Sequence, residues 1–216
     1  MEKIYQVTPL IWAVSNDGAL ASDIISMKHY KQADFYLMIG AVSQAAAVTM
    51  KKGADVTTCT TALAFTRYLK TGFELFYDAP SVDTPAAAAE TISAGGGGAG
   101  TIYRDTGSKL ICYGFNGTTF VDNETVTCSG GKTVVADGIQ KNEDILVPIV
   151  AASNTFNIEA VANRLYKIPI SSDMLGDGYD TVCINIADAN TTLYAAWAVL
   201  YGARYDAEIA KTALYN

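Results

Sequence analysis

The stretch "TISAGGGGAGTIYRD" (residues 91–105) decides the fold class, because Gly95, Gly97 and Gly100 reproduce the G-x-G-x-x-G pattern of a dinucleotide-binding loop. Such a loop follows a strand and opens a helix, whose N-terminus faces the pyrophosphate. Here the order is different: the Ala-rich "TPAAAAETI" (84–92) before the glycines favours a helix, and "TIYRD" after them favours extended chain. The run therefore predicts a linker or turn, a flexible entry into an inserted module, and not a phosphate site.

Outside this stretch, short β-branched and aromatic segments alternate with turn residues. "ADFYLMIGAV" (33–42) is apolar on both faces, as in the central strand of a sandwich, and "AAAVTMKKG" (45–53) is expected to pair with it. The tripeptide Lys70-Thr71-Gly72 predicts a hairpin between 62–69 and 72–78. Further strands are expected at 154–161, 164–170, 179–187 and 192–205. The spacing predicts an all-β chain, a jelly-roll-like β-sandwich.

Glycine marks an insertion in the middle of the chain. Of the 18 glycines, 11 lie between residues 95 and 138. We interpret 94–142 as a small β-hairpin module inserted into a parent sandwich formed by 1–93 and 143–216. Its turns are expected at Asp105-Thr106-Gly107, Asn116-Gly117, Asp122-Asn123 and Gly130-Gly131.

Helix is expected at two places only. In 84–92, Thr84 is suited to cap a helix that begins at Pro85. The C-terminal "DAEIAKTALYN" (206–216) is either a short helix capped by Asp206 or a frayed end.

Composition restricts the partners. The chain has 216 residues, of which 50% are hydrophobic and 17% charged, so a substantial core is expected. The net charge of −7 argues against nucleic acid, because phosphate binding needs clustered Lys and Arg. We expect no membrane span, since apolar runs of 18 residues are absent from the sequence, and no signal peptide, since Glu2 and Lys3 precede an alternating stretch.

Polar residues suggest no catalytic, cofactor-binding or metal site. His29 lies near no acid and nucleophile in sequence, and we expect it at the surface or an interface. Asp173, Asp177 and Asp180 have a spacing that could serve Ca²⁺, but the glycines among them favour an Asx-rich turn. "GGKT" (130–133) is similar to the end of a P-loop, yet Val126 stands where that loop needs glycine. We therefore expect a protein that is not an enzyme.

Four cysteines lie far apart in the sequence: Cys59, Cys112, Cys128 and Cys183. Without a C-x-x-C pair and with a single histidine they do not form a zinc pattern. A bridge between Cys112 and Cys128 is conceivable if they lie on neighbouring hairpins, but buried free thiols are the favoured interpretation.

Both ends of the chain carry candidate interface residues. In "MEKIYQVTPLIWAVSN" (1–16), Pro9 is unsuited to a central strand, which favours an edge strand or an arm completing a neighbour's sheet. The alternative is an ordinary first core strand. We expect contacts with other subunits from Tyr5, Leu10, Trp12, Tyr205, Ile209 and Tyr215.

The order of the outer segments, 5–42 and then "IPISSDMLGDGYDTVCINIADANTTLYAAWAVLYGARYD" (168–206), resembles small virion proteins of tailed bacteriophages whose last strand ends in an Arg-Tyr pair like Arg204-Tyr205. The insert "DTGSKLICYGFNGTTFVDNETVTCSGG" (105–131) is similar to glycine-rich hairpin modules of phage structural proteins. The resemblance implies a sandwich subunit that decorates or cements a capsid. It further implies a homotrimer that contacts the major capsid protein or other virion proteins on the capsid surface, after assembly in the host cytoplasm.

A recognition role is the alternative. A head-fibre or tail-associated module would bind host surface glycans through aromatic side chains of the insert. Tyr103, Tyr113, Phe115 and Phe120 are the candidates for these contacts.

Overall fold

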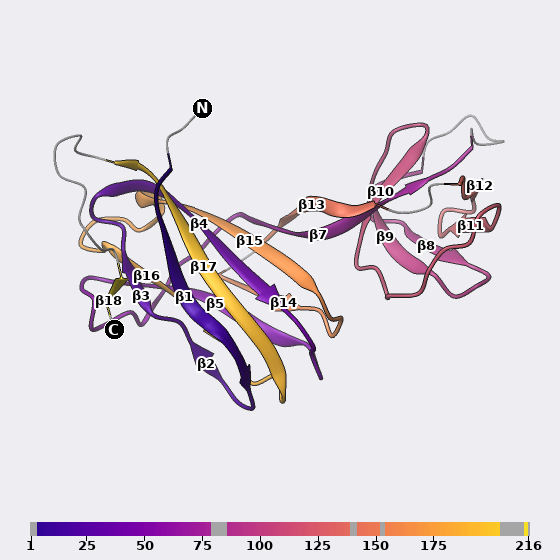
Figure 1. The fold of residues 1–216 in the computed structure, drawn as a ribbon. Helices are drawn as coiled ribbons and strands as arrows, with labels where there is room; N and C mark the ends of the chain where they lie inside the picture. Colours follow the sequence, from indigo (N-terminus) through magenta and orange to yellow (C-terminus); the bar gives the residue numbers. More distant parts are fainter. Residues whose placement is uncertain (1–3, 79–85, 139–141, 152–153, 204–213, 216) are drawn as a thin grey trace. The chain divides into compact units, whose positions relative to one another are not determined.

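The computed structural model describes residues 4–78, 86–138, 142–151, 154–203 and 214–215. The described chain is almost entirely antiparallel β, so the all-β sandwich expectation is confirmed (Figure 1). Within the described residues, the helical structure consists of the short 3₁₀ turn η1 (Ser172–Met174). Among these residues, no helix is long and apolar enough to cross a membrane.

The chain forms two compact units, one from residues 1–69 with 149–216 and one from 70–148. The inserted unit thus begins and ends outside the range 94–142 that the glycine content suggested. β7 (Arg67–Phe76) and β13 (Asn142–Val150), which pair with each other, carry the chain from one unit to the other and back. The glycine content rises at residue 95, whereas the boundary between the two units lies within β7.

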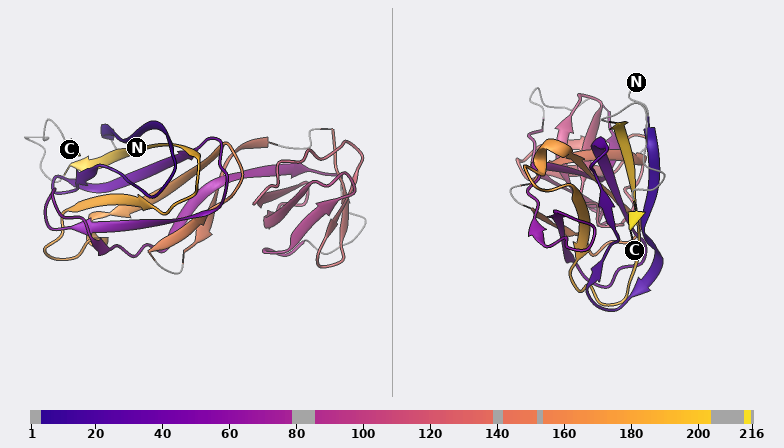
Figure 2. Two further views of the ribbon diagram at one scale, coloured as in Figure 1. Left: turned by 90° about the horizontal axis from the view of Figure 1, so that it is seen from below. Right: turned by 90° about the vertical axis from the view of Figure 1, so that its left-hand side faces the viewer.

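The first unit is a two-layer sandwich (Figures 1 and 2). One layer has the order β1-β17-β4-β15-β7, and the other has the order β14-β5-β16-β3-β18, with β2 beside β16 and β6 beside β5. Side chains from both layers form a single buried cluster, to which β4 contributes Phe35, Leu37 and Ile39, and β16 contributes Val182 and Ile184. The strands are β1 (Ile4–Asn16), β2 (Leu20–Ala21), β3 (Ile24–Ser26), β4 (Tyr30–Ile39), β5 (Ala46–Gly53), β6 (Thr61–Ala62), β14 (Thr155–Ile158), β15 (Arg164–Ser171), β16 (Thr181–Ile186), β17 (Thr192–Ala203) and β18 (Leu214–Tyr215).

The second unit is a set of hairpins around its own core. Its strands follow the order β7-β10-β9-β8-β11-β12. Phe73, Phe115 and Phe120 form the aromatic centre of this core, with ring centroids 5.0–6.0 Å apart. The remaining strands are β8 (Thr91–Ala94), β9 (Ala99–Asp105), β10 (Lys109–Tyr113), β11 (Thr125–Cys128) and β12 (Thr133–Val135).

The glycine run is a tight hairpin turn and not a flexible linker. It joins β8 to β9, closed by hydrogen bonds from Gly97 N–H to Ala94 O (2.9 Å) and from Ala94 N–H to Gly98 O (2.9 Å). Gly98 and Gly100 have a second role, because a Cβ on either would meet the ring of Phe120 at 3.1 Å or of Phe73 at 2.7 Å. The missing side chains let the strand lie directly on the aromatic core.

Asn116-Gly117 does not connect paired strands, because β10 pairs with β7 and β9, whereas β11 pairs with β8 and β12. The Asn116 side chain instead accepts from Ala99 N–H (3.2 Å) and donates to Gly97 O (2.8 Å). Asn116, which the sequence predicted in a hairpin turn, therefore connects its own loop to the glycine turn through side-chain hydrogen bonds. The expected turns at Asp105-Thr106-Gly107 and Gly130-Gly131 do join paired strands, β9 with β10 and β11 with β12.

Two expected strand pairings are wrong. β4 and β5 lie in opposite sheets, because β15 and β17 occupy both edges of β4. The hairpin around Lys70-Thr71-Gly72 is absent, since β7 runs unbroken through these residues. Gly72 serves close packing there: a Cβ would lie 2.3 Å from the Val147 side chain and 2.4 Å from Cys112 O.

The helix expected at 84–92 is also wrong over its described part, 86–92. Ala89 has φ = 70°, and β8 begins at Thr91. Long-range bonds determine the conformation, because Ala89 N–H donates to Ile102 O (2.8 Å) and Ile102 N–H donates to Glu90 O (2.7 Å). The expectation for 206–216 lies outside the described residues, except that 214–215 form β18.

Candidate interaction surface

β1 lies at the edge of its sheet, pairing along one side with β17 (Figure 2, right, indigo). The edge-strand interpretation of the N-terminal segment therefore holds within the described residues. β1 is bound to the rest of the unit by its inward side chains and by Asp23 N–H, which donates to Leu10 O (3.1 Å). Pro9 stands opposite Trp197 of β17, a position that an edge strand tolerates.

The interface candidates divide between core and surface. Trp12 is 75% exposed, whereas Leu10 is 3% exposed and belongs to the core of the sandwich. Leu10 is thus corrected from a contact residue to a core residue, because inward-facing positions of β1 pack against the second layer. Tyr5 lies in β1 and Tyr215 in β18; Tyr205 and Ile209 lie outside the described residues.

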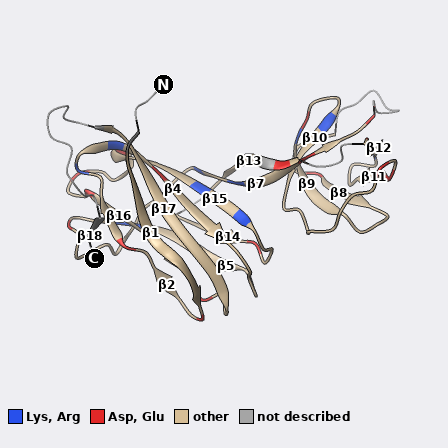
Figure 3. Cartoon of the chain, in the orientation of Figure 1, with Lys and Arg blue, Asp and Glu red and all other residues tan. Residues whose placement is uncertain are grey.

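The two strands at this edge carry no charged residue. Neither "IYQVTPLIWAVSN" in β1 nor "TLYAAWAVLYGA" in β17 contains Asp, Glu, Lys or Arg (Figure 3). Exposed apolar side chains on and beside them are Val7, Trp12, Val14, Met38 and Leu193. Soluble proteins commonly protect an edge strand with charges, so an uncharged edge with an exposed tryptophan is typical of a contact surface.

The outward face of the same sheet adds an aromatic and ionic group. Tyr36 of β4 and Trp197 of β17 are directly paired, and their rings stack at 5.3 Å with planes 6° apart. Beside them the buried Asp34 forms an ion pair with Lys167 of β15 at 2.7 Å. Burial alone lowers the pKa of Lys167, but the contact with Asp34 outweighs it, so the pKa is raised. The pKa of Tyr201 is raised to about 12, first by burial and then by Asp34 and Tyr36.

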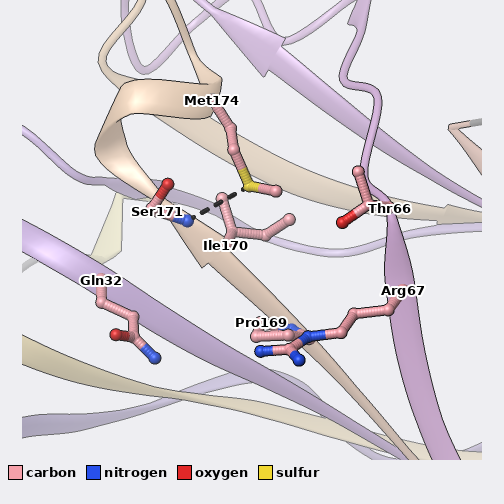
Figure 4. Close-up of a pocket in the computed structure, with 7 residues that line it drawn as sticks. All are labelled: Gln32, Thr66, Arg67, Pro169, Ile170, Ser171 and Met174. Carbon is pink, nitrogen blue, oxygen red and sulfur yellow. Dashed lines mark hydrogen bonds between the residues drawn. The ribbon is translucent and has the colours of Figure 1, made fainter. Parts of the chain in front are cut away.

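A pocket of about 320 Å³ opens on this face (Figure 4). Its polar lining comes from Gln32 of β4, Thr66 and Arg67 at the start of β7, and Ser171 at the end of β15. Within the described part of the chain, the Arg67 guanidinium has no ion-pair or hydrogen-bond partner. A free guanidinium beside hydroxyl and amide groups is suited to an anionic group, which it can bind through two parallel hydrogen bonds.

No protein-family model matches the chain, and no curated protein is similar to it.

The insert does not present the four aromatic side chains that a glycan site would require. Phe115 and Phe120 are buried with Phe73 in the core of the second unit and are corrected from candidate contacts to core residues. Tyr113 is half-buried, with the Lys70 ammonium 4.7 Å above its ring. Tyr103 on β9 is exposed. Gly98 leaves room for the ring of Phe120, and Phe115 packs against the rings of Phe73 and Phe120.

The polar candidates form no cluster in the structure. Among the described residues, no group of three His, Cys, Asp or Glu side chains could hold a metal ion. Asp173 lies in η1, and Asp177 lies between Gly176 and Gly178, whose φ angles are 74° and 82°, as expected for a turn. All four cysteines are free and buried, which confirms the favoured interpretation of these residues.

Sequence reasoning missed the aromatic and ionic face and its pocket. Its residues come from four strands and from both halves of the chain, so their proximity depends on strand pairing. The sequence contained one signal of this face. Along residues 32–39, every second side chain points away from the core (Gln32, Asp34, Tyr36 and Met38), and the apolar side chains between them point toward it.

Proposed function

We propose that this chain is a non-enzymatic structural subunit of a tailed-phage virion, a jelly-roll-like sandwich that associates with copies of itself and decorates or cements the capsid. One observation carries the proposal: the edge strand β1 is uncharged along its length and exposes Val7, Trp12 and Val14. An aromatic anchor surrounded by small apolar residues is the usual centre of a protein–protein contact. The resemblance of 5–42 and 168–206 to phage virion proteins supplies the biological setting.

The chemistry of the partner surface follows from these residues. A second copy brings its own uncharged β1 and β17, so contact between edges buries apolar side chains without burying an unpaired charge. Pro9 lacks an N–H group, and β1 pairs with β17 with register shifts; both irregularities limit continuous strand addition at this edge. Side-chain contacts at Val7 and Trp12 are therefore expected to provide most of the binding energy.

The experiment introduces a charge at this edge. Val7→Lys and Trp12→Lys are expected to convert a trimer to monomers in size-exclusion chromatography with light scattering, because a buried ammonium lacks a partner there. Val121→Lys is the matched control, since Val121 is 57% exposed against 60% for Val7 but lies in the other unit. All three variants are expected to keep their melting temperatures within about 3 °C, because the altered side chains are exposed.

Attachment to bare capsids, measured by co-sedimentation, is expected to fall in the same two variants and not in the control. Trimers that survive both lysine substitutions would remove β1 from the interface. A wild-type chain that is monomeric at high concentration and does not bind capsids would contradict the structural role.

One observation favours a second candidate, a recognition module that binds host surface glycans. The pocket at Arg67 offers a free guanidinium, an amide and two hydroxyl groups, which suit the carboxylate of an acidic sugar. Tyr103 is the exposed aromatic candidate that remains on the insert. Binding of the full chain to acidic glycans on an array, without attachment to capsids, would favour this candidate.

A further inference from the structure

Two cysteines that lie far apart in the sequence meet on the outer side of the smaller sheet of the first unit. Along β16, Val182, Ile184 and Ile186 belong to the core, so Cys183 occupies the opposite face. Cys183 is paired in register with Lys51 of β5. The segment 54–60, between β5 and β6, brings Cys59 to the same place, and both cysteines are buried.

The contacts bring the two cysteines together. Cys59 Sγ lies 3.3 Å from Lys51 O, and Cys183 Sγ lies 3.6 Å from Cys59 O. Cys59 and Cys183 lie 124 positions apart in the sequence, so their contact forms only in the folded sandwich.

The backbone of segment 54–60 is held from several directions. The Thr181 hydroxyl lies within hydrogen-bonding distance of two backbone carbonyl oxygens. Thr181 Oγ1 is 2.9 Å from Gly53 O and 2.9 Å from Asp55 O. The Asp55 carboxylate accepts from the N–H groups of Thr57 and Thr58 at 2.8 Å. Gly53 is required at the start, since a Cβ there would lie 1.8 Å from Thr58 O. The segment therefore holds Cys59 over β16 in one position, as formation of a disulfide requires.

The pKa values of the two thiols are shifted in opposite directions. The neighbouring Cys59 thiol lowers the pKa of Cys183, and the nearby Lys51 ammonium lowers it further, against the effect of burial. The Cys183 thiol raises the pKa of Cys59, with burial acting in the same direction. Because the thiolate is the nucleophile in sulfur chemistry, we expect Cys183 to react first.

We propose that Cys59 and Cys183 are an oxidation site that forms an intramolecular disulfide when the folded chain meets a peroxide. The Cys183 thiolate attacks one oxygen of hydrogen peroxide, the O–O bond breaks, and hydroxide leaves, giving a sulfenic acid. Cys59 sulfur then attacks the sulfenic sulfur, the S–O bond breaks, and water leaves with the Cys59 proton. In total, two thiols and one peroxide yield one disulfide and two waters, and the two sulfurs supply both electrons.

The disulfide has a structural consequence. It fastens segment 54–60 to β16 and links two distant parts of the first unit, which removes freedom from the unfolded chain. The oxidised protein is therefore expected to melt about 5 °C higher than the reduced protein. The chemistry depends on neither the capsid nor a glycan, so it holds whether or not the proposed function is correct.

Cys112 and Cys128 provide an internal comparison. Both are buried in the core of the second unit. Burial raises the pKa of Cys112, and the nearby Cys128 and Asp105 raise it further. Burial also raises the pKa of Cys128, which the Lys132 ammonium only partly offsets. Both shifts disfavour the thiolate, so we expect these two thiols to react more slowly than Cys183.

The experiment treats the reduced full chain with hydrogen peroxide, blocks remaining thiols by alkylation, and measures intact and peptide masses. The wild type is expected to lose two of its four thiols as a monomer and to yield a peptide pair joined through Cys59 and Cys183. In Cys59→Ser, dimedone is expected to label a sulfenic acid at Cys183. In Cys183→Ser, loss of thiols is expected to slow at least tenfold.

The double variant Cys112→Ser/Cys128→Ser is the control and is expected to oxidise as the wild type does. Because that variant alters a core, the peptide map of the wild type also stands alone as a test. A bridge between Cys112 and Cys128, or between two chains, would overturn the proposal. So would a folded wild-type chain that keeps all four thiols while the urea-unfolded chain becomes oxidised.

Discussion

Asp105 joins three segments of the second unit. Its carboxylate accepts hydrogen bonds from the Tyr77 hydroxyl at 2.5 Å and from the N–H groups of Ala86 and Gly107, both at 2.8 Å. Burial raises the pKa of Asp105, but these three bonds outweigh it, so the pKa lies below its ordinary value. Burial, followed by the bond to Asp105, raises the pKa of Tyr77. The ionised carboxylate therefore belongs to the folded state.

Asp105→Asn is expected to destabilise the second unit by about 2 kcal/mol at pH 7, because an amide accepts fewer and weaker bonds. A carboxyl with a lowered pKa stabilises the fold fully above its unfolded pKa of about 4, and this contribution disappears as pH falls through the folded pKa. The difference between wild type and variant is therefore expected to shrink below pH 4 in urea unfolding. A difference unchanged between pH 7 and pH 2.5 would contradict this, and Asp137→Asn, at an exposed site of the same unit, is the control.

Individual residues show what the sequence could and could not predict. Trp12 was expected at a contact surface because Pro9 disfavours a central strand, and it is exposed on the edge strand β1. Phe115 and Phe120 were not recognised as core, since each lies in a loop without alternation. Phe120 packs over Gly98, and Phe115 packs against Phe73 and Phe120. The contact of Cys59 with Cys183 has no local signal, because it depends on β5 and β16 being neighbours.

Among the elements, strand content was predictable but pairing was not. β15, β16 and β17 lie where β-branched and aromatic residues cluster between turns. β4 and β5 were expected to pair because they are neighbours in sequence, yet the strands beside β4 come from the last third of the chain. Composition also suggested a helix at 84–92, where bonds between Ala89, Glu90 and Ile102 determine the turn. Local preference is weak enough for two long-range hydrogen bonds to override it.

The turn before β8 contains a strained residue that can be relieved. Ala89 is exposed and has φ = 70°, a conformation that costs an alanine about 1 kcal/mol and a glycine almost nothing. Ala89→Gly is therefore expected to stabilise the second unit by about 1 kcal/mol. Ala88→Gly is the matched control, because Ala88 is also exposed but has no positive φ, and this change is expected to be neutral or slightly destabilising. Urea unfolding measures both, and equal effects would show that the turn is not strained.

The described residues form two hydrophobic cores. The sequence suggested that there are two, but it did not show which residues belong to each. The buried cluster of the first unit draws on residues 10–68 and 156–200, and that of the second draws on 73–136. Glycine content marked residues 94–142, because turns concentrate there. β7 supplies Phe73 and Leu75 to the second core without any glycine-rich signal, and this shifts the boundary toward residue 70.

These boundaries predict which excision leaves a folded chain. Thr66 O accepts from Ala151 N–H at 2.9 Å, so the two ends of the first unit are adjacent where the second unit leaves and returns. Replacing 70–148 with a short Gly/Ser linker is expected to keep the first unit folded, because none of the described residues in that range belongs to its buried cluster. The isolated segment 70–148 is likewise expected to fold around its own cluster.

The contrasting excision removes 94–142 and keeps β7 and most of β8. It deletes β9 and β10, the strands beside β8 and β7, and leaves Phe73 and Leu75 without the partners that bury them. This variant is expected to aggregate or to bind a hydrophobic dye, whereas the 70–148 excision gives a single cooperative melting transition by circular dichroism and dispersed amide resonances. If the shorter excision folded and the longer one did not, β7 and β13 would belong to the core of the first unit, and the boundary would return to the glycine-rich segment.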